Sequence, residues 1–411
     1  MLKNNCVIIG ASHAGVSLAM QLRREGWSHE IVLISDDVQL PYHRPPLSKD
    51  FLNSKKDLDQ IHLRPKKAFE DNNIDLRLGN EVTAVDIVSK TLVLNGDEKL
   101  QYGKLAFCVG STVKKIPQSE QFANVFYLRN AADAMRIQSS FSGKKRAVII
   151  GAGYIGLEVS AVLREKGIKV TVIDIAERIL ERVTSPYLSQ YMRTIHEEHG
   201  VRFMLQTGVS HFDGGKRAEF VVCDNGERLA CDIVIIGIGI TPNISVAKES
   251  GLNVETGIIV NERCQASEED IYAAGDCTEH YNCFYDRVIT LESVQNANDQ
   301  ARCAASNIAG KEQSYESIPW FWSDQYDMKI QMVGLQNSED DVVVRGNLTS
   351  PNKNGLSLFY MKESRIVAAD CVNRPKEFAS AKQLIQSRMK LDASKIRDES
   401  IDPFEFKDHA L

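Results

Sequence analysis

The sequence predicts an α/β protein with two Rossmann-like dinucleotide-binding domains and a smaller C-terminal α/β domain. Three observations support this prediction. A strand, a glycine turn, a helix and a second strand follow one another between Arg146 and Asp174, and the same order occurs near the N-terminus, between Cys6 and Asp36. The chain of 411 residues is long enough for two or three domains, each with its own core.

The unit that begins at Arg146 has the clearest signature. An apolar strand pattern over 147–150 leads into Gly151, Gly153 and Gly156 in G-x-G-x-x-G spacing. A helical pattern then runs from Tyr154 to about 166, and a second strand pattern covers 169–173. Such a turn lets a pyrophosphate approach bare backbone at a helix N-terminus, where N–H groups and the helix dipole favour negative charge. The unit therefore predicts a nicotinamide dinucleotide site.

Asp174 follows the second strand of this unit and is placed to accept hydrogen bonds from the adenosine ribose. Its carboxylate would repel a 2′-phosphate, and the next residues, Ile175 and Ala176, offer no base to receive one. NADH is therefore expected rather than NADPH. Arg178 and Arg182 lie within reach of this end of the site, although both could equally be solvated loop residues.

Composition limits the possible classes of function. The net charge of −6 gives no general attraction to nucleic acid or anionic membranes, and no apolar run is long enough for a membrane span. Because residues 1–5 lead directly into a strand, without a signal peptide, we expect a cytoplasmic protein. Nine cysteines without a C-x-x-C pair or a metal-ligand cluster indicate reduced, mostly buried thiols, with no disulfide and no metal site.

The N-terminal unit repeats the pattern with a strand over 6–9, a glycine turn over 10–15, a helix to about 25 and a strand over 30–34. Its turn residues are Gly10, Ala11, Ser12, His13, Ala14 and Gly15. Ser12 replaces the second glycine of the pattern, so the phosphate must tolerate a small hydroxyl there. Asp36 is the expected ribose ligand, and His13 is expected to pack or hydrogen-bond rather than to catalyse. Two such units predict two dinucleotides, with electrons passing from one to the other.

The segment 40–52, LPYHRPPLSKDFL, follows the first unit. Its three prolines favour an extended conformation and exclude a regular helix before Leu47. It is either a stiff surface loop or a segment that runs along a flavin and directs Arg44 and Lys49 toward it.

Four stretches resemble the oxygenase-coupled NADH-dependent ferredoxin reductases of the FAD-dependent pyridine nucleotide-disulfide oxidoreductase superfamily. They are PYHRPPLSKDFL, GAGYIGLEVSA with the downstream ILERVTSP, IYAAGDC and PWFWSDQYDMKIQMVG. Their order and spacing match over nearly the whole chain. Rubredoxin reductases and apoptosis-inducing factor are similar at a greater distance.

The resemblance implies a glutathione-reductase-like fold. The FAD-binding domain would be discontinuous, formed by residues 1–112 and 242–318, with the NADH-binding domain, 113–241, inserted between the two segments. A C-terminal α/β domain, 319–411, would follow. Val109 stands where such families often have threonine, a small departure. The tail from Asp392 is rich in charge and is expected to be loosely ordered.

The resemblance also assigns cofactor contacts. Gly275 and Asp276 would bind the FAD ribityl chain, and a helix over 292–309 would direct its N-terminus, near Val294, at the flavin pyrimidine ring. The remaining FAD contacts would be Arg44, Lys49, Val82, Arg129 and Trp320. The NAD contacts would be Gly151, Gly153, Tyr154, Ile155, Gly156, Glu158, Asp174, Arg182 and Gly239.

Three residues are expected to act in catalysis. In the resembling enzymes the positions of Lys49 and Glu158 meet near flavin N5, so we predict an ion pair that positions the nicotinamide; the alternative is two unrelated surface charges. Trp320 matches a tryptophan that packs near the flavin on the side where the ferredoxin docks, whereas Phe321 is expected in the core.

No redox-active cysteine pair occurs at the positions where disulfide reductases of this fold carry one. Cys277 and Cys283 have the wrong spacing, and Cys277 is expected to be a small buried residue. Reduced FAD must therefore pass its electrons to an external acceptor. The predicted function is an NADH-dependent ferredoxin reductase that supplies a [2Fe-2S] ferredoxin of a haem monooxygenase or Rieske dioxygenase.

Alternatives remain open at this point. A rubredoxin reductase, an NADH oxidase or a quinone reductase would use the same site with a different acceptor. A redox sensor similar to apoptosis-inducing factor would carry targeting segments or insertions, which this sequence lacks. Acidic ferredoxins favour a basic docking patch, for which the candidates are Arg302, Lys329, Arg374 and Lys376. The sequence fits a monomer or a weak homodimer.

Overall fold

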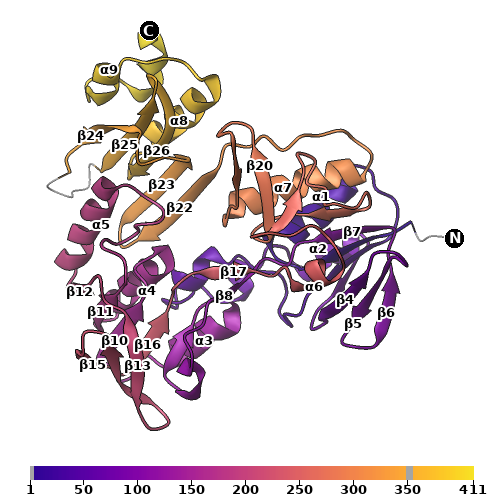
Figure 1. The fold of residues 1–411 in the computed structure, drawn as a ribbon, viewed down its shortest axis with the longest axis horizontal. Coiled ribbons are helices and arrows are strands. Elements are labelled where there is room, and N and C mark those ends of the chain that lie inside the picture. The colour runs from indigo at the N-terminus through magenta and orange to yellow at the C-terminus, as the bar shows by residue number, and fades with distance from the viewer. Residues whose placement is uncertain (1–3, 349–354) are drawn as a thin grey trace. The chain divides into compact units, whose positions relative to one another are not determined.

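The structure, a computed structural model, describes residues 4–348 and 355–411. The chain forms two compact units, both visible in Figure 1. The first unit is built from residues up to His43, Leu58–Thr112 and Ile240–Pro319, and the second from Arg44–Asp57, Val113–Gly239 and Trp320–Leu411. Among the residues that the structure describes, no helix combines the length and apolar character needed to cross a membrane.

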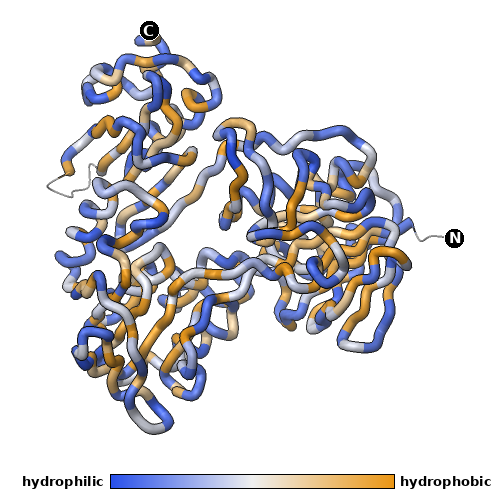
Figure 2. The backbone as a smooth tube through the Cα atoms, in the orientation of Figure 1, coloured by the Kyte–Doolittle hydropathy of each residue, from blue (hydrophilic) through white to orange (hydrophobic). Residues whose placement is uncertain are grey.

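A five-stranded parallel sheet, in the order β19-β7-β1-β2-β3, is the centre of the first unit. Its strands are β1 (Cys6–Ile9), β2 (Ile31–Ile34), β3 (Ile74–Arg77), β7 (Lys104–Phe107) and β19 (Ile271–Ala273). Ile8 and Leu33 pack on one face with helices α1 (His13–Arg24) and α7 (Val294–Ile308), while Val7 and Val32 face a second core. Burial on both faces explains why β1 and β2 are uninterrupted apolar runs, whereas β3, at the edge of the sheet, is only partly buried and contains Asp75 and Arg77. Figure 2 shows the hydropathy along the whole backbone.

The second unit contains an equivalent parallel sheet, in the order β12-β11-β10-β16-β9. Its strands are β9 (Val125–Tyr127), β10 (Arg146–Ile150), β11 (Lys169–Ile173), β12 (Val201–Met204) and β16 (Ile233–Ile236). The helices of this part are α3 (Ala131–Ser139), α4 (Tyr154–Glu165) and α5 (Pro186–Glu198). The predicted α/β fold class is confirmed, and both predicted strand–turn–helix–strand units form.

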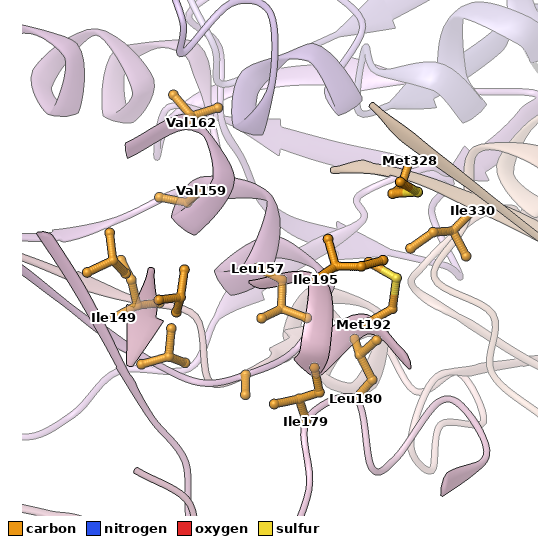
Figure 3. Close-up of a cluster of buried hydrophobic side chains, with 14 of the residues drawn as sticks. Ile149, Leu157, Val159, Val162, Ile179, Leu180, Met192, Ile195, Met328 and Ile330 are labelled. Carbon is orange, nitrogen blue, oxygen red and sulfur yellow. The ribbon is translucent and has the colours of Figure 1, made fainter. Parts of the chain in front are cut away.

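A five-stranded antiparallel sheet, in the order β22-β23-β26-β25-β24, also belongs to the second unit. Its strands are β22 (Trp320–Gln325), β23 (Met328–Gly334), β24 (Asp341–Gly346), β25 (Leu356–Lys362) and β26 (Arg365–Val372). One hydrophobic core joins the two sheets of this unit: Met192 and Ile195 of α5 lie in the same cluster as Met328 and Ile330 of β23 (Figure 3). The C-terminal sheet and the glycine-turn sheet are thus packed as a single body.

The remaining elements lie outside these three sheets and the helices named above. In the first unit they are η2 (Asp59–Ile61), α2 (Lys66–Asp71), β4 (Val82–Asp86), β5 (Thr91–Leu94), β6 (Glu98–Gln101), α6 (Ser245–Glu249), β18 (Ile258–Val260), β20 (Thr278–Asn282) and β21 (Arg287–Ile289). In the second unit they are η1 (Pro45–Ser48), η3 (Ser119–Gln121), β13 (Val209–Gly214), β14 (Ala218–Cys223), β15 (Arg228–Ala230), α8 (Pro375–Ser387), α9 (Ala393–Arg397) and η4 (Pro403–His409). Two further strands are β8 (Ser111–Val113) and β17 (Ile240–Pro242).

The expectation of a loosely ordered tail after Asp392 is wrong. The tail forms α9 and η4, and its Ile396 and Phe406 are buried. Arg345 of β24, itself buried, donates hydrogen bonds to the carbonyl oxygens of Ile396 at 3.1 Å and of Ile401 at 2.7 Å. A buried guanidinium has several N–H donors, so it can bind several carbonyl groups of an irregular segment. The many charged residues of the tail give no indication of this ordering in the sequence.

Candidate functional site

The glycine turn of the second unit has two glycines that the fold requires and one that it does not. A Cβ on Gly151, whose φ is 108°, would lie 2.3 Å from the Gly237 carbonyl oxygen, and one on Gly156 would lie 2.0 Å from the Gly151 carbonyl oxygen. Gly153, the N-cap of α4, has an ordinary extended conformation with φ −81° and ψ −179°. A Cβ there would meet no atom within 4 Å. The open space at this helix N-terminus fits a dinucleotide pyrophosphate, which needs a close approach to the backbone.

Asp174 is held against the same turn. Its Oδ2 accepts a hydrogen bond from the Ala152 N–H at 2.6 Å, and its Oδ1 accepts one from the Ala176 N–H at 2.8 Å. Each carboxylate oxygen has a second lone pair, so the group keeps acceptor capacity for ribose hydroxyls. The sequence indicated the ribose role of Asp174 but not this attachment of the β11 end to the glycine turn.

Other predicted NAD contacts lie around this turn. Arg182 is close to Gly239, because a Cβ on Gly239 would be 3.4 Å from Arg182 Nη2. Ile155 is exposed. The Tyr154 hydroxyl donates to Met332 Sδ at 2.7 Å, so this side chain attaches the start of α4 to the C-terminal sheet.

The first unit repeats the glycine geometry. A Cβ on Gly10, whose φ is 103°, would lie 2.2 Å from the Cys108 carbonyl oxygen, and one on Gly15 would lie 1.9 Å from the Gly10 carbonyl oxygen. Ser12 is the N-cap of α1 with an extended backbone, as Gly153 is of α4, and its hydroxyl makes no capping hydrogen bond. His13 is buried, with its ring centroid 5.4 Å from that of His43, which agrees with the expected packing role.

The acidic residues after β2 have different environments. Asp37 accepts hydrogen bonds from the Gln39 N–H and the Tyr42 hydroxyl, whereas the predicted ribose ligand Asp36 is exposed. Val82, predicted as a flavin contact, lies on β4 with its side chain in an apolar core beside Leu94.

The Gly275–Asp276 turn meets the end of the Gly10–Gly15 turn, where α1 begins. A Cβ on Gly275 would lie 3.4 Å from the Ala14 Cβ, so these two predicted contacts are neighbours. Ser111 donates to Asp276 Oδ2 at 2.9 Å, and Gln300 of α7 accepts the Gly275 N–H at 2.8 Å. Ser111 and Gln300 were not predicted, because neither lies near Asp276 in the sequence. The helix α7 begins at Val294, as predicted.

The predicted ion pair between Lys49 and Glu158 is present. Lys49 Nζ lies 2.7 Å from Glu158 Oε2, and the two side chains are 15% and 1% exposed. Ser48 donates to the same oxygen at 2.5 Å, and Ser323 of β22 donates to Glu158 Oε1 at 2.6 Å. The alternative of two unrelated surface charges is wrong. Ser48 and Ser323 were missed, although both lie within the motifs that carried the resemblance.

Two further sets of predicted residues lie in the second unit. Arg44 Nη1 donates to the Arg129 carbonyl oxygen at 2.7 Å. The Trp320 ring centroid is 5.5 Å from that of Trp322, and Phe321 packs on the main core, as expected.

Three of the four candidate docking residues form ion pairs within the chain. Arg302 pairs with Asp299, Lys376 Nζ lies 3.0 Å from Asp402, and Arg374 lies 3.1 Å from Glu377. Because an acidic partner neutralises each of these three side chains, they offer an acidic ferredoxin less positive charge than we expected from the sequence. Lys329 is exposed on β23.

None of the cysteines, all of which lie within the described residues, forms a disulfide. All nine are free thiols, and Cys283 alone is exposed. Burial raises the pKa of Cys277 to about 12, which keeps this thiol protonated and unreactive. The expectation that Cys277 is a small buried residue is confirmed.

Comparisons with known proteins agree with this geometry. The family model described as pyridine nucleotide-disulphide oxidoreductase matches residues 4–301, and the model described as reductase C-terminal matches residues 320–403. Putidaredoxin reductase CamA from Pseudomonas putida is 39% identical over 97% of this chain and 95% of its own length. The ferredoxin–NAD(+) reductase component of an anthranilate 1,2-dioxygenase system from Burkholderia cepacia is 35% identical over 96% of this chain and 97% of its own length.

Solved structures show the same relationship. The reductase in the crystal structure of the covalent putidaredoxin reductase–putidaredoxin complex has a TM-score of 0.96 and 38% identity, over 100% of this chain and 99% of that chain. The ferredoxin reductase for the CYP199A2 system from Rhodopseudomonas palustris has a TM-score of 0.94 and 34% identity, over 98% of this chain and 99% of that chain. The chain therefore belongs to the pyridine nucleotide-disulphide oxidoreductase family, with the C-terminal domain of its ferredoxin-reductase members.

Proposed function

We propose that the protein is an NADH-dependent ferredoxin reductase, which takes a hydride from NADH onto FAD and delivers electrons one at a time to a [2Fe-2S] ferredoxin. That ferredoxin would serve a haem monooxygenase or a Rieske dioxygenase. The names of the relatives include reductases of putidaredoxin and of an anthranilate 1,2-dioxygenase system, which supports this acceptor class. The protein would work as a monomer or a weak homodimer.

The observation that carries the proposal is the state of the cysteines. A disulfide reductase of this family needs two thiols beside the flavin to accept the electron pair. Here all nine cysteines are free, eight of them are buried, and neither glycine turn contains one. The electron pair therefore has to leave the protein, and an external one-electron carrier can receive it in two steps.

In the first unit, the chain would bind FAD through the Gly10–Gly15 turn, with Asp36 on the ribose and Asp276 on the ribityl chain. Bound FAD supplies the hydride-accepting and single-electron chemistry. Ser111 and Gln300 hold the Gly275–Asp276 turn, so they would fix the position of the Asp276 carboxylate. The α7 N-terminus would place partial positive charge toward the bound group.

In the second unit, the chain would bind NADH across Gly151–Gly156, with Asp174 on the adenosine ribose. Asp174 would disfavour a 2′-phosphate by charge repulsion, which supports NADH over NADPH. The buried Lys49–Glu158 pair would orient the nicotinamide. A fixed pair of this kind acts by pre-organising the reacting geometry rather than by proton transfer.

A stopped-flow experiment tests the proposed function. The FAD-loaded protein is mixed anaerobically with NADH and then, separately, with a [2Fe-2S] ferredoxin, a rubredoxin and a quinone. We expect rapid loss of flavin absorbance with NADH, followed by fast reduction of the ferredoxin. Fast flavin reduction with slow transfer to the ferredoxin and fast transfer to rubredoxin or the quinone would overturn the proposed acceptor. A relative named rubredoxin-NAD(+) reductase from Pseudomonas putida, 33% identical over 90% of this chain and 96% of its own length, justifies the rubredoxin test.

The role of Lys49 has a matched control in the same segment. Lys55 pairs with Glu165 at 3.4 Å, so two ion pairs join the segment 44–57 to α4, but the Lys55 pair is exposed. We expect Lys49→Ala to slow flavin reduction by about ten- to a hundredfold, since misplaced reactants lose about that much rate. Lys55→Ala should leave the rate unchanged. Equal rates for Lys49→Ala and the wild type would refute the positioning role.

A further inference from the structure

A chain of buried hydrogen bonds runs from Glu158 into the C-terminal sheet and back to helix α5. Ser323 Oγ is 2.6 Å from Glu158 Oε1, and Gln325 Nε2 is 3.0 Å from Ser323 Oγ. Gln325 Oε1 is 2.8 Å from His196 Nε2, and the Tyr326 hydroxyl is 3.3 Å from His196 Nδ1. Ser323 and His196 have no exposed side-chain surface, and Gln325 is buried as well.

The carboxylate fixes the direction of every bond in this chain. An ionised carboxylate only accepts, so Ser323 must donate to Glu158 and its oxygen must accept from the Gln325 amide. The Gln325 carbonyl oxygen then faces His196, so Nε2 of that ring must carry the proton. His196 Nδ1 is left to accept from the Tyr326 hydroxyl. All four donors therefore point toward Glu158.

The protonation state of His196 agrees with this direction. Burial lowers the pKa of His196 to about 4, so the ring is neutral near neutral pH. A neutral imidazole donates from one nitrogen and accepts at the other, as both neighbours require. Within this hydrogen-bond network, the only charged groups are then Glu158 and its ion-pair partner Lys49, and both lie at one end of the network.

This chain of hydrogen bonds orients its side chains but does not conduct protons. Gln325 donates through an amide N–H, and an amide does not pass that proton on to the next acceptor as a hydroxyl or an imidazole does. The network therefore has no continuous path for proton release. Its effect is to hold the Ser323 hydroxyl hydrogen on Glu158 Oε1, while Lys49 and Ser48 hold Oε2.

We propose that Ser323 is a positioning residue for the hydride-transfer step, and that Gln325 and His196 set the direction of its hydroxyl. The inference rests on the proposed function, because Glu158 matters only if the Lys49–Glu158 pair orients NADH. It assigns a catalytic contribution to strand β22 of the C-terminal sheet. That strand would complete the set of donors that fixes the buried carboxylate.

The test compares Ser323→Ala with Ser357→Ala. Ser357, on β25 of the same sheet, is equally buried and is not a partner of Glu158. Two quantities are measured on the FAD-loaded proteins: the limiting rate of flavin reduction by NADH, and the dissociation constant of NAD+ by titration calorimetry. We expect Ser323→Ala to lower the rate by about ten- to a hundredfold with less than about a threefold change in affinity. Ser357→Ala should match the wild type in both quantities.

A second variant tests the direction of the chain. Gln325→Glu keeps the size of the side chain but replaces the amide donor with an acceptor, which draws the Ser323 proton away from Glu158. We expect a rate loss similar to that of Ser323→Ala, and this variant decides the question if Ser323→Ala does not fold. A wild-type protein that NADH does not reduce would overturn the proposed function itself. A reducible wild type with Ser323→Ala and Gln325→Glu within twofold of it, or an equal loss in Ser357→Ala, would overturn the positioning role.

Discussion

Replacing Asp370 with asparagine should stabilise the protein at neutral pH and have a smaller effect in acid. Asp370 lies on β26 and is buried. Its Oδ2 accepts hydrogen bonds from the Thr184 hydroxyl at 2.7 Å and the Tyr360 hydroxyl at 2.6 Å. Burial raises the pKa of Asp370 from 3.8 to about 6, against the smaller opposite effect of the two hydroxyl donors.

The sign and size of the effect follow from linkage. The folded state binds the Asp370 proton more tightly than the unfolded state does. The contribution of this proton to the free energy of unfolding is therefore fully present below pH 3.8 and is lost as the pH rises through 6. A difference of about two pKa units corresponds to about 3 kcal/mol at pH 7.5 and about 1 kcal/mol at pH 4.5. An asparagine keeps one carbonyl oxygen for both hydroxyls and does not ionise. Asp370→Asn should therefore raise the free energy of unfolding by up to these amounts.

Urea unfolding of the FAD-loaded protein at the two pH values measures this change, with equal slopes required for the comparison. Asp213→Asn is the control, because Asp213 forms an exposed ion pair with Arg228 on β15 and should change stability by less than about 1 kcal/mol. The reasoning would be refuted if Asp370→Asn raised the free energy of unfolding equally at pH 4.5 and pH 7.5, or lowered it at pH 7.5.

Two further predictions concern the turn and the tail. Gly153→Ala should leave the melting temperature within a few degrees of the wild type but raise the KM for NADH by about tenfold or more, because its Cβ meets no protein atom yet occupies the open space at the α4 N-terminus. Gly156→Ala, whose Cβ would lie 2.0 Å from a carbonyl oxygen, should instead fail to fold stably in a thermal shift assay. Arg345→Ala should lower the free energy of unfolding by about 3–5 kcal/mol and expose the segment 393–409 to limited proteolysis, because four tail carbonyl groups lose their donor. Unchanged cleavage would contradict this.

The sequence was sufficient for features that depend on neighbouring residues. Both glycine turns and their strands were predicted within a residue or two, because turn, helix start and apolar run follow one another in the chain. The Lys49–Glu158 pair, which joins distant segments, was predicted only through the family resemblance. Its geometry then agreed with that prediction.

Features that depend on tertiary packing could not be predicted. Ser323 lies 165 positions from Glu158, and nothing near either residue indicates that they meet. The tail was expected to be loose because its charges dominate the sequence, while the buried Arg345 that binds it lies about 50 residues earlier. In both cases one buried polar group satisfies a distant partner, and such a partner leaves no local pattern.

The C-terminal sheet is attached to the helices of the glycine-turn sheet by several polar contacts as well as through the shared core. Ser323 donates to Glu158, and the Tyr154 hydroxyl donates to Met332. Thr184 and Tyr360 both donate to Asp370. Glu158 and Tyr154 belong to α4, and Thr184 lies just before α5. Buried polar contacts tolerate little displacement, because a small shift leaves a donor or acceptor unsatisfied at a cost of about 1–3 kcal/mol. A change in the C-terminal sheet that moves these anchors should therefore affect the step that uses NADH before it affects the FAD-binding unit.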